Sequence, residues 1–96
     1  EFKNLLKNHL KNFQVEDLGP HSSDSVDYTD FAEKLCKQIQ SQSASEAPST
    51  FGILICGSGQ GMAMKANKYS HIRAALCWDL VSTKLSREHN NANVLC

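Results

Sequence analysis

The sequence lacks a long hydrophobic run and an excess of charge of either sign. Its longest apolar stretch, residues 51–56, is far shorter than the ~20 residues that cross a bilayer, and its opening segment is too polar for a signal peptide. Ten basic and ten acidic side chains balance, so the chain offers no electrostatic footprint for nucleic acid or for an anionic membrane. These absences predict a soluble cytoplasmic protein that binds a small molecule or another protein.

Cysteine spacings typical of metal sites are also absent. The four cysteines, Cys36, Cys56, Cys77 and Cys96, lie 19 to 21 residues apart, with no C-x-x-C pair and no Cys/His pair at zinc-ligand spacing. We interpret them as free thiols in a reducing compartment, and we expect no metal site.

Apolar residues form helical stripes and short continuous runs that alternate along the chain. This pattern predicts helices over residues 2–13, 28–40, 61–69 and 79–90, and strands over residues 14–19, 51–56, 72–78 and 92–96. The first helix is expected to bury one face, and the last to turn Val81 and Leu85 inward. Asp27 or Thr29 is available to cap the second helix.

The predicted strand at residues 51–56 does not alternate between apolar and polar residues, which is typical of a strand buried on both faces. Helices that alternate with such strands predict an α/β domain: a Rossmann-like, open, mostly parallel sheet in three layers, with helices on both faces. The chain begins on a helix and stops on a strand. We therefore expect residues 1–96 to form a single, partial domain that lacks the first strand and the last helices.

The segment CGSGQG, residues 56–61, places a thiol at the end of a predicted strand, before a glycine-rich turn and a helix. In open parallel sheets ligands bind at this edge. Three glycines let several backbone N–H groups converge on an anion, and such a setting favours the reactive form of a thiol. The turn fits neither a dinucleotide fingerprint, because Met62 stands where Gly or Ala is needed, nor a phosphate P-loop, because the G-K-[ST] ending is missing.

A lone cysteine at a strand end is most often a small buried hydrophobe, so a second group must support a site. His89, which precedes the last predicted strand, is expected to face the same sheet edge as Cys56 if the strands are parallel. The simpler interpretation of His89 is a positive charge that interacts favourably with the dipole at a helix C-terminus. Ser58 could donate a hydroxyl to an oxyanion, or simply fit a tight turn. Arg73 and Arg87 could hold an anion, although surface solvation is the simpler interpretation of either.

Four segments together resemble the ribose-5-phosphate isomerase B family: DSVDYTDFAEKL, GILICGSGQGMAMKANK, IRAALC and SREHNNANVLC. The family pattern includes an I-C-G-[ST]-G-x-G turn and an S-R-x-H-N-x-x-N-V-L segment, and the match runs in order over nearly the whole chain. The resemblance implies an aldose–ketose isomerase of the non-oxidative pentose phosphate pathway. Such an enzyme interconverts ribose 5-phosphate and ribulose 5-phosphate through a cis-enediolate and needs no cofactor.

The resemblance also implies roles for particular residues. Cys56 corresponds to the family's base, which moves a proton between C1 and C2 of the sugar phosphate. His89 corresponds to the residue that assists ring opening, and Asn90 and Tyr28 correspond to residues that contact substrate. The turn whose amides and hydroxyl hold the enediolate oxygens corresponds to Gly57, Ser58, Gly59, Gln60 and Gly61.

The chain departs from the family pattern in several places. It starts after the family's first strand with its S-D-H-A-G segment, and it stops before the family's phosphate-binding arginines, so no residue is assigned to the phosphate. Thr29 stands where proline is common, and Asn91 where aspartate is common. The resemblance implies a homodimer, or a tetramer of dimers, in which the neighbouring subunit completes each site; the small core of so short a chain agrees.

Other functions stay open at this point. A sister isomerase for a six-carbon sugar phosphate, such as galactose 6-phosphate or allose 6-phosphate, would use a similar scaffold, although a cysteine at position 56 favours the pentose enzyme. A non-catalytic sugar-phosphate-binding module would use the turn as a passive anion cradle. A purely structural domain would leave the Cys-Gly turn and His89 as a coincidence.

Overall fold

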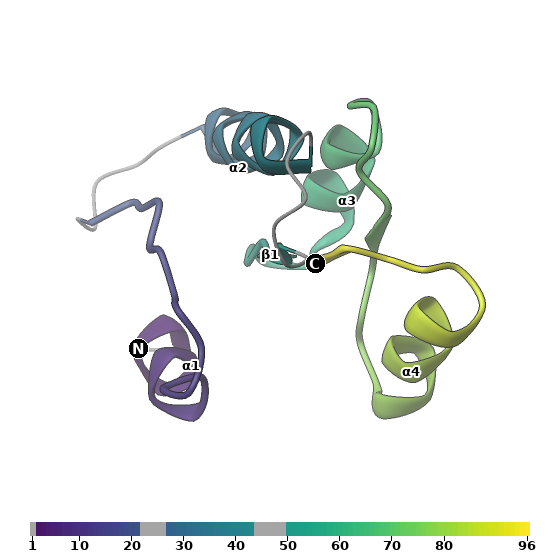
Figure 1. Cartoon of the computed structure of the whole chain (residues 1–96), viewed down its shortest axis with the longest axis horizontal. Coiled ribbons are helices and arrows are strands. Elements are labelled where there is room, and N and C mark those ends of the chain that lie inside the picture. The colour runs from purple at the N-terminus through teal and green to yellow at the C-terminus, as the bar shows by residue number, and fades with distance from the viewer. Residues whose placement is uncertain (1, 22–26, 44–49) are drawn as a thin grey trace.

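An open parallel sheet lies between two layers of helices in the computed structural model, which describes residues 2–21, 27–43 and 50–96 (Figure 1). The helices are α1 (Phe2–His9), α2 (Tyr28–Ser43), α3 (Gln60–Ala66) and α4 (Leu80–Glu88), and the strands are β1 (Gly52–Ile53), β2 (Ala74–Ala75) and β3 (Val94–Leu95). In Figure 1, α2 and α3 lie above the sheet, and α1 and α4 lie below it. The predicted three-layer α/β fold is confirmed.

The strand β3, last in the sequence, lies in the middle of the sheet and pairs parallel to both β1 and β2. Pairing continues past these short strands, because the N–H of Leu54 donates to the Leu95 carbonyl and the N–H of Cys77 donates to the Cys96 carbonyl. All three strands therefore end at one edge, which we call the carboxyl edge. Cys56 follows β1 there, and the opposite edge is the amino edge.

The core lies between the sheet and the pair α2 and α3. A Cβ atom at Gly52 would lie 2.6 Å from a methyl carbon of Leu35, so glycine in β1 lets α2 approach the sheet closely. The buried apolar residues of this layer are Ala32, Cys36, Ile39, Leu54, Met62, Ala63, Ala66, Ile72, Val94 and Cys96. Because α2 and α3 contribute so many of them, this layer fixes the position of the turn between β1 and α3.

Asp27 caps α2, as one of the two predicted choices. Its carboxylate accepts the N–H of Thr29 at 3.1 Å and the Thr29 hydroxyl at 2.7 Å. These bonds satisfy donors that the first turn of a helix leaves unpaired. They also fix the entry to α2, where Tyr28 stands.

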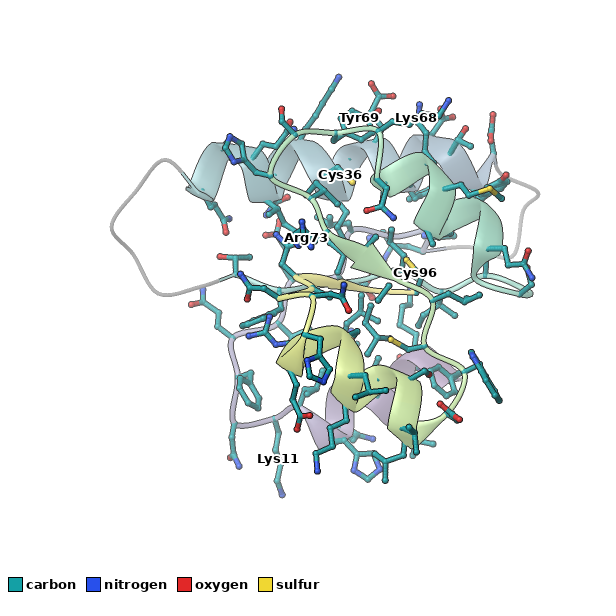
Figure 2. The ribbon with its side chains drawn as sticks, turned by 90° about the vertical axis from the view of Figure 1, so that its right-hand side faces the viewer. Lys11, Cys36, Lys68, Tyr69, Arg73 and Cys96 are labelled. Atoms are coloured by element: carbon teal, nitrogen blue, oxygen red, sulfur yellow. The ribbon has the colours of Figure 1, made fainter. Side chains whose placement is uncertain are left out.

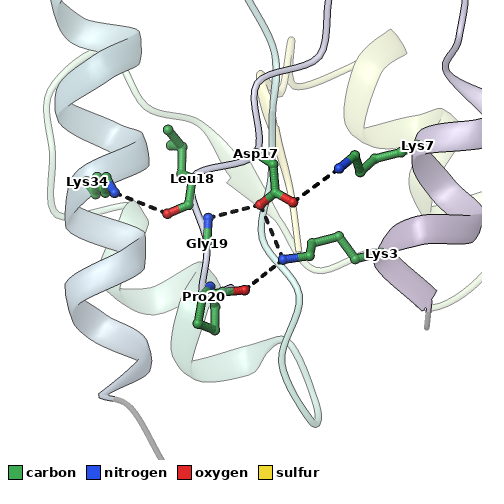
Figure 3. A network of polar contacts seen from close by, with 7 residues as sticks. All are labelled: Lys3, Lys7, Asp17, Leu18, Gly19, Pro20 and Lys34. Atoms are coloured by element: carbon green, nitrogen blue, oxygen red, sulfur yellow. Dashed lines mark hydrogen bonds and ion pairs between the residues drawn. The ribbon is translucent and has the colours of Figure 1, made fainter. Parts of the chain in front are cut away.

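The helix α1 is shorter and less buried than predicted. It ends at His9, and none of its residues is fully buried. Polar contacts attach it instead: the ammonium groups of Lys3 and Lys7 lie 3.2 and 3.4 Å from the Asp17 carboxylate. Figure 3 shows these two lysines, with Lys3 also donating to the Pro20 carbonyl. The helix therefore lies on the molecule through charge more than through apolar packing.

The predicted strand at residues 14–19 is wrong, because that segment has no regular secondary structure. A cavity of about 480 Å³ borders both this segment and β1, and is lined by apolar residues of α1 and α2. Because no described strand lies beside this segment, its backbone N–H and C=O groups form no sheet hydrogen bonds with a described strand. Side chains hold it in place, as where Lys34 donates to the Leu18 carbonyl at 3.2 Å (Figure 3).

Two further expectations about burial are wrong. Ile55 is exposed, because β1 is an edge strand beside the cavity and is not covered on both faces. Val81 and Leu85 are exposed as well, because α4 turns Ser82 and Ser86 toward the protein. The N–H of Ala92 donates to the Ser86 carbonyl at 2.9 Å and holds that side of the helix against the chain leading to β3.

Within the described residues, no helix combines the length and the apolar character that crossing a bilayer needs.

Candidate active site

The thiol of Cys56 lies at the carboxyl edge, directly after β1, and is half-buried. Its sulfur accepts a hydrogen bond from the N–H of Gly59 at a nitrogen–sulfur distance of 3.1 Å. Gly59 has a left-handed φ of 79°, and a Cβ atom there would lie 2.7 Å from a Leu76 methyl and 3.1 Å from the Cys96 carbonyl carbon. Only glycine fits this position, which aims the N–H back at the sulfur.

The rest of the turn is open to solvent. Gly57, Ser58 and Gln60 are exposed, and no atom lies within 4 Å of the place where a Cβ of Gly57 would stand. The hydroxyl oxygen of Ser58 accepts the N–H of Gln60 at 3.3 Å, which leaves its proton free to point outward. A small ligand can therefore approach Cys56 and Ser58 from outside.

Tyr28 reaches this turn from the start of α2. Its hydroxyl oxygen would lie only 2.5 Å from a Cβ atom at Gly61, so the phenol ring rests directly on the glycine. The structure thus brings Tyr28 to the turn that carries Cys56 and Ser58. Its role toward substrate, which the resemblance implies near the subunit boundary, stays a prediction. Glycine is required at two positions of the turn for different reasons: the backbone conformation at Gly59 and the room for this ring at Gly61.

Two of the other cysteines, Cys36 and Cys96, are buried, whereas Cys56 is not. Burial, followed by the neighbouring thiols of Cys77 and Cys56, raises the pKa of the Cys96 thiol to about 12. Burial also raises the pKa of Cys36, whose S–H points to the Ala66 carbonyl. Cys77 donates its S–H to the Ala75 carbonyl at 3.5 Å. All four cysteines lie among the described residues and are unpaired, as predicted.

His89 lies at the amino edge, away from Cys56. It ends α4 as the residue after Glu88. The adjacent Asn90 accepts a hydrogen bond at its carbonyl from Nε of Arg73, which precedes β2, at 2.5 Å. In Figure 2, Arg73 and Cys96 mark the two opposite ends of the sheet. The prediction that His89 and Cys56 share an edge is therefore wrong within one chain.

The direction of α4 explains this error. The strands are parallel, as predicted, but α4 leaves β2 at the carboxyl edge and must run back to reach the start of β3. Every crossover helix in a parallel sheet returns in this way. The residue after such a helix faces the start of the next strand, and the sequence order of helix and strand could have shown it.

Arg73 and Arg87 both donate hydrogen bonds to the turn that carries His89 and Asn90. The sequence did not predict this structural role. The guanidinium of Arg87 lies 4.9 Å from the centre of the Phe51 ring, just before β1. It also donates to the Ala92 carbonyl, and to the Asn91 side chain at 3.3 Å. Asn91 has a left-handed φ of 48°, so this is a sharp turn held by cations rather than a loose loop.

Among the described residues, no three histidine, cysteine or acidic side chains are arranged to hold an ion.

Comparison with known proteins places this arrangement in a family. The model of the Ribose/Galactose Isomerase family matches residues 1–96. The chain belongs to that family. It is similar to a probable ribose-5-phosphate isomerase B of Mycoplasma pneumoniae, with 44% identity over all of this chain and 62% of the relative. It is also similar to ribose-5-phosphate isomerase B of Escherichia coli, with 39% identity over 85% of this chain and 52% of the relative.

Solved structures agree with this membership of the ribose/galactose isomerase family. A ribose 5-phosphate isomerase from Thermotoga maritima superposes with a TM-score of 0.86 and 47% identity, covering 97% of this chain and 62% of its own. Ribose-5-phosphate isomerase B from Mycoplasma genitalium, solved with bound ribulose-5-phosphate, gives 0.88 and 42% identity, covering 98% and 61%. The chain thus spans about three fifths of the length of these relatives.

Proposed function

We propose that this chain carries the cysteine half of an isomerase site that interconverts ribose 5-phosphate and ribulose 5-phosphate. The observation that carries the proposal is the hydrogen bond from the Gly59 N–H to the Cys56 sulfur, in a turn that is open on its outer side. A thiolate is the form of cysteine that accepts such a bond best. The relative solved with bound ribulose-5-phosphate supports the choice of substrate.

The chemistry follows from this geometry. With open-chain ribose 5-phosphate at the turn, the Cys56 thiolate takes the proton from C2, and the electron pair of that bond forms the C1–C2 double bond of a cis-enediolate. Charge moves onto oxygen, where turn amides and the Ser58 hydroxyl stabilise it; one such donor is worth roughly 3 kcal/mol in known enzymes. The hydroxyl proton on O2 passes to O1, which leaves the negative charge on O2. The new S–H then returns its proton to C1 as the C2=O bond of ribulose 5-phosphate forms.

Ring opening requires a second group, and we assign it to His89 of another copy of the chain. Within one chain His89 lies at the amino edge, too far along the sheet to share a cleft with Cys56. A site with both groups is therefore formed between two copies, which makes the protein at least a homodimer. Asn90 accompanies His89 into that site and contacts the substrate.

Hydrogen-isotope transfer during isomerisation tests the proposal, and the whole protein is used for this test. Isomerisation of ribose 5-phosphate in D₂O should place deuterium at C1 of ribulose 5-phosphate, because the thiol exchanges its proton with solvent. Cys56→Ala should lower kcat by at least about 1,000-fold while ribulose 5-phosphate still binds, whereas Cys77→Ala, which alters a thiol at the same edge, should keep kcat within a few-fold. Full activity of Cys56→Ala would end the proposal.

The same assays separate the remaining candidates. Faster turnover of allose 6-phosphate or galactose 6-phosphate than of ribose 5-phosphate would assign the enzyme to six-carbon substrates. Binding of ribulose 5-phosphate without turnover of any of these sugars would identify a binding module.

A further inference from the structure

The turn after α4 is attached to the residues that lead into β2. The N–H of Asn93 donates to the Arg73 carbonyl at 2.9 Å, and the N–H of Arg73 donates to the Asn93 side-chain oxygen at 2.8 Å. The side-chain amide of Asn93 donates in turn to the His71 carbonyl at 2.8 Å. These bonds fix the end of the turn and keep Arg73 beside it, just before β2 (Figure 2).

The guanidinium of Arg73 reaches the other end of this turn. Its Nε–H donates to the Asn90 carbonyl at 2.5 Å, and a charged donor makes such a bond stronger than a neutral one. The bond holds the peptide group between Asn90 and Asn91, and Asn91 has the left-handed φ of 48° at which the chain reverses. Arg73 therefore fixes the turn where its backbone conformation is least common for a residue other than glycine.

The imidazole of His89 depends on this turn for its direction. The side chain is exposed, and it forms no hydrogen bond or ion pair with any part of the chain that the structure describes. A group that moves a proton must lie within hydrogen-bond reach of the atom that receives it, and a displacement of about 1 Å can lower a rate by about 100-fold. The backbone of the turn therefore decides whether the His89 ring meets the substrate.

We propose that Arg73 is a positioning residue for the ring-opening half of the site. By its bond to the Asn90 carbonyl it holds the turn in the shape that presents the His89 ring and the Asn90 side chain to the substrate. Arg73 itself contacts neither the substrate nor the reacting atoms. The inference rests on the proposed function, which assigns ring opening to His89.

Arg87 supports the same turn, but its contacts also stabilise the fold. Its guanidinium lies 4.9 Å from the centre of the Phe51 ring and donates to the Ala92 carbonyl, so its loss would also remove packing in front of β1. The Arg73 side chain is exposed, and within the described chain its one hydrogen bond is the bond to Asn90. A substitution of the Arg73 side chain therefore alters the turn and leaves the core packing unchanged.

Isomerisation has two parts that use different halves of the site. In ring opening, the bond between C1 and the ring oxygen breaks with its electrons on that oxygen, which takes a proton from His89, while the C1 hydroxyl loses its proton and becomes the aldehyde. Exchange at C1 of ribulose 5-phosphate uses the other half alone: the Cys56 thiolate takes a proton from C1, the S–H exchanges with D₂O, and a deuteron returns to C1. Ribulose 5-phosphate forms no five-membered ring, because its phosphate occupies the hydroxyl that would close it. Slower ring opening therefore leaves this exchange intact.

Two substitutions of Arg73 differ in the atom that they place at the position of Nε. Methionine puts a methyl carbon there, and glutamine puts an amide nitrogen that donates the same bond. In the whole protein, Arg73→Met should lower kcat for ribose 5-phosphate at least about 10-fold and keep exchange at C1 of ribulose 5-phosphate within about 3-fold of wild type. Arg73→Gln should recover kcat to within about 3-fold of wild type. Lys68→Met, which removes another exposed cation, is the matched control and should change neither rate (Figure 2).

A third substitution separates the hydrogen bond from the charge. Arg73→Lys keeps the positive charge but places a carbon at the position of Nε. Its kcat should therefore fall while exchange continues, as in Arg73→Met, and this result does not depend on whether the methionine variant folds. Circular dichroism checks the folding of each variant.

Wild-type kcat in folded Arg73→Met and Arg73→Lys, or an equal loss of isomerisation and exchange in both, would overturn the positioning role. A higher KM for both sugar phosphates that Arg73→Gln does not correct would show that the guanidinium binds the substrate phosphate, and it would overturn the role as well. Full activity of Cys56→Ala, with isomerisation still slower than exchange in Arg73→Met, would instead remove the proposed base and leave Arg73 in its positioning role.

Discussion

Cys56 and His89 lie at opposite edges of the same parallel sheet. The first follows β1 at the carboxyl edge, and the second ends α4 at the amino edge. The separation is a direct result of a crossover helix that returns antiparallel to the strands. Under the proposed function, neither residue completes the site within its own chain, and each copy in a dimer would provide one half of two sites.

Mixing two inactive variants should restore activity. In Cys56→Ala the base is missing from both sites of a dimer, and in His89→Ala the ring-opening group is missing from both. A hybrid dimer has one site with both defects and one site with neither, so an equal mixture should regain about a quarter of the wild-type rate. The measurement is the isomerisation rate after subunit exchange, and each variant alone is the control. No recovery in a mixture shown to contain hybrids would place both groups in one chain.

Replacing two glycines of the turn should have opposite results. Gly59→Ala forces a left-handed φ on alanine and drives a methyl into Leu76 and the Cys96 backbone, which should lower the free energy of unfolding by about 2 kcal/mol. Gly57→Ala adds a methyl to open space and should leave stability within about 0.5 kcal/mol. Urea unfolding followed by circular dichroism measures both. Equal losses of unfolding free energy in the two variants would contradict the different surroundings of Gly57 and Gly59.

The cysteines should react with iodoacetamide in a fixed order. Cys56 is half-buried in an open turn, whereas burial raises the pKa of Cys36 and raises that of Cys96 to about 12, so these two stay protonated and covered. Peptide mass spectrometry at pH 7.5 should show Cys56 alkylated at least about 10-fold faster than Cys36 and Cys96. Ribulose 5-phosphate should slow this alkylation. A faster reaction at Cys96 in the folded chain would contradict the structure.

Acid should release the contact between α1 and the following segment. The N–H of Gly19, and then the ammonium groups of Lys3 and Lys7, lower the pKa of Asp17 from 3.8 to about 2. The folded carboxyl is therefore the stronger acid, so its stabilisation is complete above about pH 5 and disappears as the pH falls from 4 to 2. After screening by solvent we expect a contribution of roughly 1 kcal/mol.

The variant Asp17→Asn isolates this effect. Its free energy of unfolding should lie below that of the wild type by a constant amount between pH 5 and 7, and the two should converge near pH 2. Asp30→Asn, which removes a carboxylate on α2, is the matched control. A difference that persists unchanged at pH 2 would show that Asp17 acts by packing instead of charge.

The sequence predicted the elements that carry the most apolar residues. The stripe of α2 and the location of β1 within residues 51–56 were predicted, because both follow from local apolar spacing. The burial of that run on both faces was not, because it depends on what covers the edge of the sheet. The cap by Asp27 followed from the same helix. The contact of Tyr28 with the turn did not, because it depends on the packing of α2 against Gly61. The thiol at the carboxyl edge was placed by the parallel strand order, which the alternation of elements implies.

The errors arose where the outcome depends on neighbours distant in sequence. Residues 14–19 have the composition of a strand but lack a strand beside them in the described chain. Val81 and Leu85 have helical spacing, yet α4 turns its small polar residues inward and leaves these two exposed. The supporting roles of Arg73 and Arg87 depend on contacts across the amino edge, which spacing cannot show.

The ion pairs of Lys3 and Lys7 with Asp17 have one more consequence. Since α1 buries none of its residues completely, its attachment depends on interactions that dissolved salt weakens, with a Debye length of about 8 Å at physiological ionic strength. The rest of the molecule depends on apolar packing, which salt does not weaken. We therefore expect added salt to loosen the attachment of α1 while leaving the packing of α2 and α3 on the sheet intact.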